Sequence, residues 1–159
     1  ALTGHMVLST LHTNDAASTI TRLLNMGVEP FLVTAAVNLV EAQRLIRKIC
    51  AACKQAIPTP KDELKTLGAT DEEIATAACA RGAGCSICNG SGYKGRIAMY
   101  EVMTFSEKLK ALVLQGVSAA ELKAEAIRAG MRTLRMSGIA KVCLGVTTFD
   151  EVARITAAD

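Results

Sequence analysis

The first residues of the chain combine an apolar run with a polar break. "HMVLSTLH", residues 5–12, is short, apolar and rich in leucine, and this pattern predicts a buried strand. The polar residues that follow predict the start of a helix, with Thr13 or Asn14 as its N-cap and Asp15 in its first turn. The helix is predicted over residues 16–26, ahead of a glycine that suits its end.

Pro30 predicts the start of a second helix, over residues 30–43, because proline suits the first helical position. "RLIRKI", residues 44–49, alternates between charged and apolar positions, which fits either a short strand or the end of that helix. Farther along, "RIAMYEVM", residues 96–103, predicts another strand.

The chain from Ser106 onward has the pattern of consecutive helices. Ser106 is a candidate N-cap for residues 107–115, and Ser118 with Glu121 forms a capping box for the next helix. A third helical segment, residues 133–145, is weakened by its internal glycine, Gly138. Thr148 and Glu151 have the spacing of another capping box.

Residues 50–96 differ from both flanks, because they combine two of the three prolines with charged runs and the glycine-rich "NGSGYKG". This composition indicates a small inserted module. We therefore expect three parts: residues 1–49, a module over residues 50–96, and a strand with a helical region over residues 97–159.

Composition excludes some classes of function. Half of the 159 residues are apolar, so a core can form, but aromatic residues make up only 3%. The net charge of +3 and the scarcity of stacking aromatics argue against nucleic-acid binding. No run reaches the roughly 20 apolar residues that span a bilayer, and no signal peptide is visible. The chain starts at Ala1 without an initiator methionine, so we expect a piece of a longer protein.

Four of the six cysteines form two C-x-x-C pairs, Cys50 with Cys53 and Cys85 with Cys88. Two such turns complete a tetrahedral thiolate site, which predicts structural zinc with no open position for water. The 31 residues between the pairs exceed the common spacing, but a longer loop adds little closure entropy. The alternatives are scattered thiols or a redox pair. Cys79 and Cys143 are expected to be buried thiols.

The chain has two histidines, His5 and His12, at opposite ends of the predicted strand. Their odd spacing places them on opposite faces, about 20 Å apart, so they cannot share a metal ion. His12 lies at the carboxyl end of the strand, just before a helix N-terminus, where ligands and anions bind in α/β proteins. Each histidine has the alternative of a purely structural role.

Several catalytic motifs are missing from these 159 residues. There is no G-x-S-x-G and no phosphate-binding G-x-x-x-x-G-K-[ST] loop. "IAMYE" imitates the strand that follows such a loop, but without the loop we interpret Glu101 as an ordinary residue at a strand end.

The sequence resembles the secretion ATPases, the family of type II secretion protein E and the type IV pilus assembly ATPases. The resemblance rests on "LTGHMVLSTLHTNDAASTITRLLNMGVEPFLV", "AQRLIRKICAAC", "GCSICNGSGYKGRIAMYEVM" and "GMRTLRMSGIAKVCLGVTTFDEVARIT". "CSICNGSG" also fits the zinc repeat of J-domain chaperones, but that region needs four repeats and only one is present.

The resemblance implies an α/β fold: the C-terminal portion of a RecA-like ATPase core with an inserted four-cysteine zinc module and a helical C-terminal region. It implies a cytoplasmic motor at the bacterial inner membrane, a homo-hexamer that uses ATP and Mg²⁺ and works on a membrane-embedded platform protein. The phosphate-binding loop precedes the histidine box in this family, so the isolated chain is expected to be inactive. The alternative is a non-enzymatic, zinc-stapled protein-binding adaptor.

The resemblance also assigns roles to residues. His5 and His12 match the histidine box, which implies sensing of the nucleotide's terminal phosphate, and Cys50, Cys53, Cys85 and Cys88 match the tetracysteine motif. Thr10, Thr13, Asn14, Arg44 and Arg96 lie in matching segments and are expected near the nucleotide. For the two arginines, salt bridges in the core or contacts with a neighbouring subunit are equal alternatives.

Overall fold

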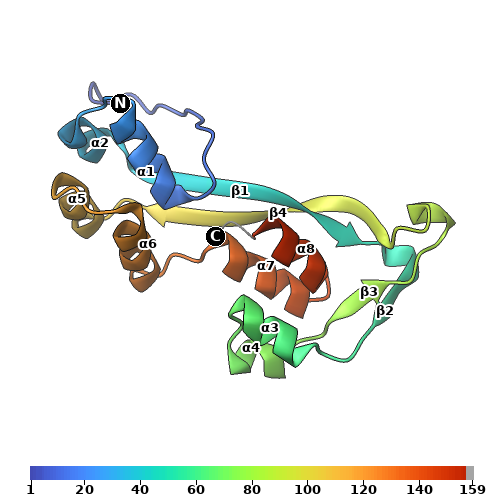
Figure 1. Cartoon of the computed structure of the whole chain (residues 1–159). Helices are drawn as coiled ribbons and strands as arrows, with labels where there is room; N and C mark the ends of the chain where they lie inside the picture. Colours follow the sequence, from blue (N-terminus) through green and yellow to red (C-terminus); the bar gives the residue numbers. More distant parts are fainter. Residues whose placement is uncertain (157–159) are drawn as a thin grey trace. The chain divides into compact units, whose positions relative to one another are not determined.

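The computed structural model describes residues 1–156 and contains both helices and strands. It divides into two compact units: unit 1 comprises Ala1–Ala42 and Glu101–Thr133, and unit 2 comprises Gln43–Tyr100 and Leu134–Asp159. The three parts expected from the sequence have boundaries that differ from those of the two units, and they stay a prediction. The chain passes from one unit to the other along strands β1 (Leu39–Ile49) and β4 (Tyr93–Thr104), both drawn in Figure 1, and again between Thr133 and Leu134.

Strands β1 and β4 pair with each other in a two-stranded sheet. The Phe105 amide donates to the carbonyl of Asn38 at one end of the pair (2.9 Å), and the Cys50 amide donates to the carbonyl of Gly92 at the other (2.9 Å). The start of each strand therefore lies opposite the end of its partner, which is the antiparallel arrangement. The predicted strand over residues 96–103 is confirmed as part of β4.

Unit 1 is a helical layer with its own core. Its helices are α1 (Ala16–Asn25), α2 (Pro30–Ala36), α5 (Glu107–Leu114) and α6 (Ala119–Arg128). Helix α1 buries Ala16, Ala17 and Ile20 in one cluster with Met103 and Phe105. The predicted caps are confirmed, since the hydroxyl of Ser106 accepts from the Leu109 amide, and Ser118 and Glu121 form the reciprocal capping box.

Unit 2 combines short strands, single 3-10 turns and small helices. Its elements are η1 (Ala51–Cys53), β2 (Lys54–Ala56), α3 (Lys61–Leu67), α4 (Asp71–Ala75), β3 (Ala80–Gly82), η2 (Ser86–Cys88), α7 (Leu134–Cys143) and α8 (Phe149–Ile155). Strands β2 and β3 pair antiparallel, with Gln55 opposite Arg81. Within residues 1–156, no helix is both long enough and apolar enough to cross a bilayer.

Helix α7 keeps Gly138 in its interior for a packing reason. A side chain added at Gly138 would place its Cβ 2.5 Å from a methyl group of Val152 and 2.8 Å from the sulfur of Met99. Both neighbours are fully buried. Glycine lowers the helix propensity of α7, but because it has no side chain, α8 and β4 can approach the α7 backbone closely.

The strand predicted over residues 5–12 is not formed in the structure. This segment has neither helix nor strand, and large apolar side chains such as Met6 and Leu8 are 88% and 85% exposed. A strand requires a hydrogen-bonded neighbour, and the pairs within residues 1–156 are β1 with β4 and β2 with β3. The apolar pattern is thus present without the partner that would make it a strand.

The second helix is shorter than predicted. Helix α2 ends at Ala36, and residues 39–43 of the expected helix belong to β1. The apolar run through this region has no polar face, so its period cannot separate a helix from a strand. The open alternative for residues 44–49 is decided in favour of a strand.

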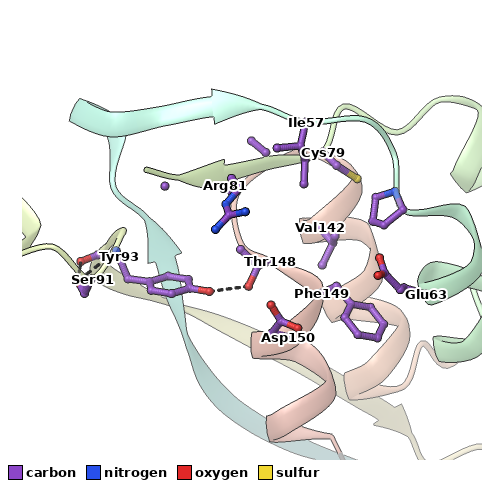
Figure 2. A pocket seen from close by; sticks show the side chains of 13 residues that line it. Ile57, Glu63, Cys79, Arg81, Ser91, Tyr93, Val142, Thr148, Phe149 and Asp150 are labelled. Carbon is purple, nitrogen blue, oxygen red and sulfur yellow. Dashed lines mark hydrogen bonds between the residues drawn. The ribbon is translucent and has the colours of Figure 1, made fainter. Parts of the chain in front are cut away.

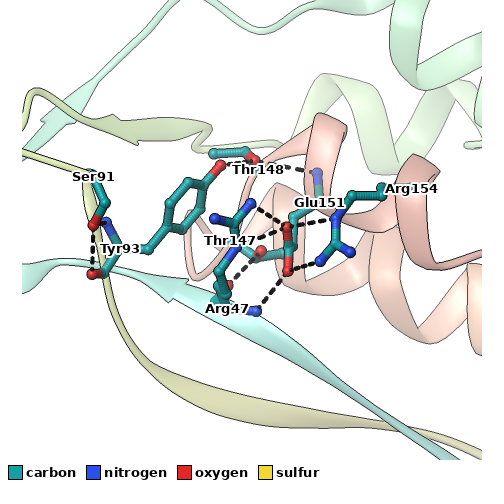
Figure 3. A network of polar contacts seen from close by, with 7 residues as sticks. All are labelled: Arg47, Ser91, Tyr93, Thr147, Thr148, Glu151 and Arg154. Atoms are coloured by element: carbon teal, nitrogen blue, oxygen red, sulfur yellow. Dashed lines mark hydrogen bonds and ion pairs between the residues drawn. The ribbon is translucent and has the colours of Figure 1, made fainter.

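Glu151 of α8 is a buried carboxylate held by two arginines (Figure 3). Arg47 donates to it from its backbone amide (3.1 Å), from Nε (3.0 Å) and from Nη2 (2.7 Å), and Arg154 Nη2 donates at 2.8 Å. Thr148 caps α8 as predicted, but the Glu151 side chain turns to the arginines. The capping-box prediction is therefore half right.

The same network fixes Arg47 from other directions. Its guanidinium carbon lies 4.2 Å from the centre of the Tyr93 ring, and its carbonyl accepts from the Thr147 hydroxyl at 2.8 Å. The Tyr93 hydroxyl lies 2.7 Å from the hydroxyl of Thr148. Strand β1 is thus joined to α8 by a charge pair and hydrogen bonds, and to Tyr93 of β4 by a cation–π contact.

We expect Glu151→Gln to remove part of the acid sensitivity of folding. Burial alone would raise the pKa of Glu151, but the two arginines lower it to about 2 from an ordinary 4.5. Its stabilising contribution, on the order of 3 kcal/mol, is therefore present above about pH 4.5 and is lost as the pH falls toward 2. Urea unfolding at pH 7 and pH 3 measures the difference.

The matched control is Asp150→Asn, which neutralises the exposed carboxylate next to Glu151. Comparing the variants at each pH cancels the contribution of all other titrating groups. Equal loss of unfolding free energy on acidification in Glu151→Gln and in the original chain would contradict the assignment.

Candidate functional site

The four cysteines of the two C-x-x-C pairs come together in unit 2. Cys50 and Cys53 flank η1, and Cys85 and Cys88 flank η2, so two tight turns point their sulfurs at one place. The four sulfur atoms all lie within 4.8 Å of one another. Strand β2 follows the first turn, and strand β3 lies shortly before the second. Their pairing brings the two distant segments together.

The spacing of the sulfurs matches a metal tetrahedron. Sγ–Sγ distances are 3.9 Å from Cys50 to Cys85, 3.8 Å from Cys53 to Cys88 and 3.7 Å from Cys85 to Cys88. A tetrahedron with metal–sulfur bonds of about 2.3 Å has edges of about 3.8 Å. A disulfide would need sulfurs about 2 Å apart. The geometry therefore fits a metal ion held by four thiolates.

Backbone amides surround the sulfur of Cys88. The amides of Cys85 (3.2 Å) and Gly92 (3.3 Å) both donate to it. Burial alone would raise the pKa of Cys88, but these amides and the neighbouring thiols lower it to about 6. Burial and the hydrogen bonds to neighbouring thiols raise the pKa of Cys53 to about 11. The protein thus stabilises one thiolate in advance, and a cation would displace the remaining protons.

Cys79 is separate from this cluster. It is buried at the wall of a cavity of about 350 Å³ in unit 2, near Val142 and Ile57, as Figure 2 shows. Burial raises the pKa of Cys79, and likewise that of Cys143, so both thiols hold their protons. The expectation that these two cysteines are buried thiols fits Cys79 fully and Cys143, which is half-buried, in part.

The histidine segment belongs to unit 1. His5 is exposed, and its Nδ1 lies 3.1 Å from the hydroxyl of Thr3. Thr10 and His12 are exposed as well. Within residues 1–156, the four cysteines form the group of three or more possible metal ligands that lie close together, and neither histidine belongs to it.

His12 lines a shallow polar groove of about 310 Å³ in unit 1. The loop contributes Thr13 and Asn14 beside it, and Thr13 lies 2.7 Å from the hydroxyl of Thr19. Helix α1 contributes Ser18, Thr21, Arg22 and Asn25 to the lining, and the first residue of α6, Ala119, completes it. The four α1 residues recur at the spacing of one helix face, a pattern that is visible in the sequence but that no motif marked.

The N-terminus of α1 is already occupied by carboxylates. The N-cap is Asp15, neither Thr13 nor Asn14, and its carboxylate accepts from the Ser18 amide at 2.7 Å. Burial alone would raise the pKa of Asp15, but Ser18 and Lys123 hold it below its ordinary value. A phosphate bound at these amides would meet this negative charge, and the expectation of an anion near this helix N-terminus stays a prediction.

The two expected arginines belong to unit 2, whereas the histidine segment belongs to unit 1. Arg44 is half-buried in β1, and Arg96 is exposed in β4. Their roles stay predictions. Arg22, which no motif marked, lines the same groove as His12.

Four cysteines that could hold a metal ion and a groove lined by His12 are thus the two candidate sites within residues 1–156. Residues 1–154 match the family described as Type II/IV secretion system protein, and the chain belongs to that family.

Relatives with a described role support this membership. The type IV pilus assembly ATPase PilB of Myxococcus xanthus is 56% identical over 100% of this chain and 28% of that protein. PilB of Thermus thermophilus is 47% identical over 96% of this chain and 17% of that protein. Type II secretion system protein E of Pseudomonas aeruginosa is 42% identical over 98% of this chain and 30% of that protein. The chain thus spans less than a third of each relative's length.

We expect the chain to bind one equivalent of a divalent metal that prefers thiolates. Cobalt(II) is a convenient probe, because four-thiolate coordination gives it a strong charge-transfer absorption. Titration of the reduced chain should saturate at about one ion per chain.

Cys88→Ser should abolish this absorption, because it removes the thiolate that the amides of Cys85 and Gly92 stabilise. Cys143→Ser is the matched control, since this thiol lies outside the cluster, and it should bind as the original chain does. Equal binding by the two variants would show that the cluster is not the metal site.

Proposed function

We propose that this chain is the C-terminal part of an ATP-hydrolysing motor that drives type IV pilus assembly or type II protein secretion. The observation that carries the proposal is the match to PilB of Myxococcus xanthus, 56% identical over the full chain. The type IV pilus assembly relatives reach higher identity than the type II secretion relative, 56% and 47% against 42%, which favours pilus assembly.

Hydrolysis then depends on the rest of the motor. These 159 residues contain no phosphate-binding G-x-x-x-x-G-K-[ST] loop, so the phosphate cradle and the Mg²⁺ ligands come from outside them. The exposed apolar side chains of Met6, Val7 and Leu8 support this view, because a strand that lacks neighbours here would find them in a RecA-like core. The isolated chain has negligible ATPase activity.

The histidine segment is the part of this chain that meets the nucleotide. His12, with Thr13, Asn14 and Arg22 in the same groove, offers an imidazole, a hydroxyl, an amide and a guanidinium to a phosphate. The contact is made by side chains, because carboxylates occupy the helix N-terminus. His5 lies at the other end of the segment, so its role is separate from that of His12.

The metal of the cysteine cluster is zinc, held by Cys50, Cys53, Cys85 and Cys88. Four thiolates in a closed tetrahedron leave no position for water, so zinc acts as a structural staple that replaces a larger core in unit 2. The stapled region provides a stiff surface. We assign it to contact with an inner-membrane platform protein, and we assign the working motor to a cytoplasmic homo-hexamer at that membrane.

The test uses a full-length motor in which this chain replaces the matching segment of the Myxococcus xanthus relative. We expect the chimera to hydrolyse ATP and to restore pilus assembly in a strain without its own motor. His12→Ala should lower kcat on the order of 100-fold, the usual cost of losing a group that stabilises transition-state charge.

Lys61→Ala is the control, since Lys61 is an exposed residue of α3 in unit 2. A folded hexameric chimera without ATPase activity would disprove the motor proposal. Activity that survives His12→Ala unchanged would disprove only the phosphate contact. Activity and pilus assembly restored by the chimera would exclude the non-enzymatic adaptor.

A further inference from the structure

Glu101 is a buried carboxylate in an apolar row of β4. The residues two positions away on either side, Met99 and Met103, are fully buried, and so is Glu101, at 0% exposed. An ionised group in such surroundings is costly unless hydrogen bonds compensate it. Its Oε1 accepts from the backbone amide of Ala16 at 2.8 Å. A glutamate that looks ordinary in the sequence thus contacts a residue 85 positions away.

Ala16 is the first residue of α1, so Glu101 satisfies an amide that the helix itself leaves open. Asp15, the residue before it, satisfies the Ser18 amide at 2.7 Å. Lys123 of α6 lies 3.3 Å from the Asp15 carboxylate and offsets part of the charge. The first turn of α1 is therefore tied both to β4 and to α6.

This first turn directly follows the loop that carries the histidine. Residues 12–14 precede Asp15 without a break, and the preceding segment has no strand partner within residues 1–156. The place of His12 in unit 1 therefore depends on the contacts of the first turn and on the Thr13–Thr19 pair. A shift of the α1 N-terminus would move His12 in the groove.

We infer that Glu101 is a positioning residue that holds the His12 loop in register with the nucleotide site. It acts through the Ala16 amide and touches no substrate itself. The inference rests on the proposed function and adds to it a residue that no motif assigned.

The first test measures the loop directly in the full-length chimera. Glu101→Ala should increase the hydrogen–deuterium exchange of the amides in residues 12–16 by at least about tenfold, because the Ala16 amide loses its acceptor. Glu101→Gln keeps an acceptor oxygen and should retain most of the protection. Unchanged exchange in Glu101→Ala would overturn the inference, whatever the activity.

The second test is a double-mutant cycle in ATP turnover. Glu101→Ala should lower kcat about tenfold with KM changed less than about twofold, since misplacement of a contacting group weakens catalysis. In the His12→Ala background it should cause no further fall, because Glu101 acts through the His12 loop. Equal falls in both backgrounds would show a general structural effect and overturn the inference.

Two further variants keep the result interpretable. Glu73→Ala is the matched control, because Glu73 also accepts from an amide at a helix start, that of Thr70 at 3.0 Å, but in unit 2. It should leave kcat and the exchange of residues 12–16 unchanged. If Glu101→Ala does not fold, Glu101→Asp withdraws the carboxylate by one methylene and enters the same cycle. A His12→Ala variant of unchanged kcat would disprove the phosphate contact, while the exchange data still decide the role of Glu101.

Discussion

The pairing of β1 with β4 is the interaction on which both units depend. In unit 1, Met103 of β4 and Phe105 just beyond its end belong to the apolar cluster, and in unit 2, Ile46 of β1 and Met99 of β4 are fully buried. Each unit thus forms its core on its own part of the same two strands. The pair also leads directly into the cysteine turns, since Cys50 follows β1 and its amide donates to Gly92 just before β4. Loss of this pairing would remove the support of both cores.

In each unit, a buried glutamate links parts of the chain that lie more than 80 residues apart in sequence. Glu151 meets Arg47, 104 residues earlier, and Glu101 meets the Ala16 amide, 85 residues earlier. Burying a charge contributes little net stability, because its desolvation offsets the gain from pairing. Its effect lies in the penalty for any arrangement that leaves the charge unpaired. We therefore interpret both glutamates as residues that favour the observed packing of these distant segments over alternative arrangements.

Local signals in the sequence were good predictors, and long-range ones were not. The caps at Ser106 and Ser118 are formed by neighbours three residues apart, so their residue types alone predict them. The turn within each C-x-x-C pair was equally predictable, because it is local, and the presence of two such pairs indicated one shared metal site. Glu101 and Arg47 gave no such signal, since their partners lie 85 and 104 residues away along the chain. The strand over residues 5–12 was mispredicted for the same reason, because a strand needs a partner that an apolar pattern cannot supply.

The occupied N-terminus of α1 changes how this family member would meet a phosphate. A free helix N-terminus binds anions through its open amides and its dipole. Here Asp15 and Glu101 use those amides, so under the proposed function the charge of a nucleotide would be met by the side chains of the groove, His12 and Arg22 among them. Side chains on a loop are precise only when the loop is held. In our proposal, the same two carboxylates that keep the anion from the helix N-terminus would also supply the rigidity that the histidine requires.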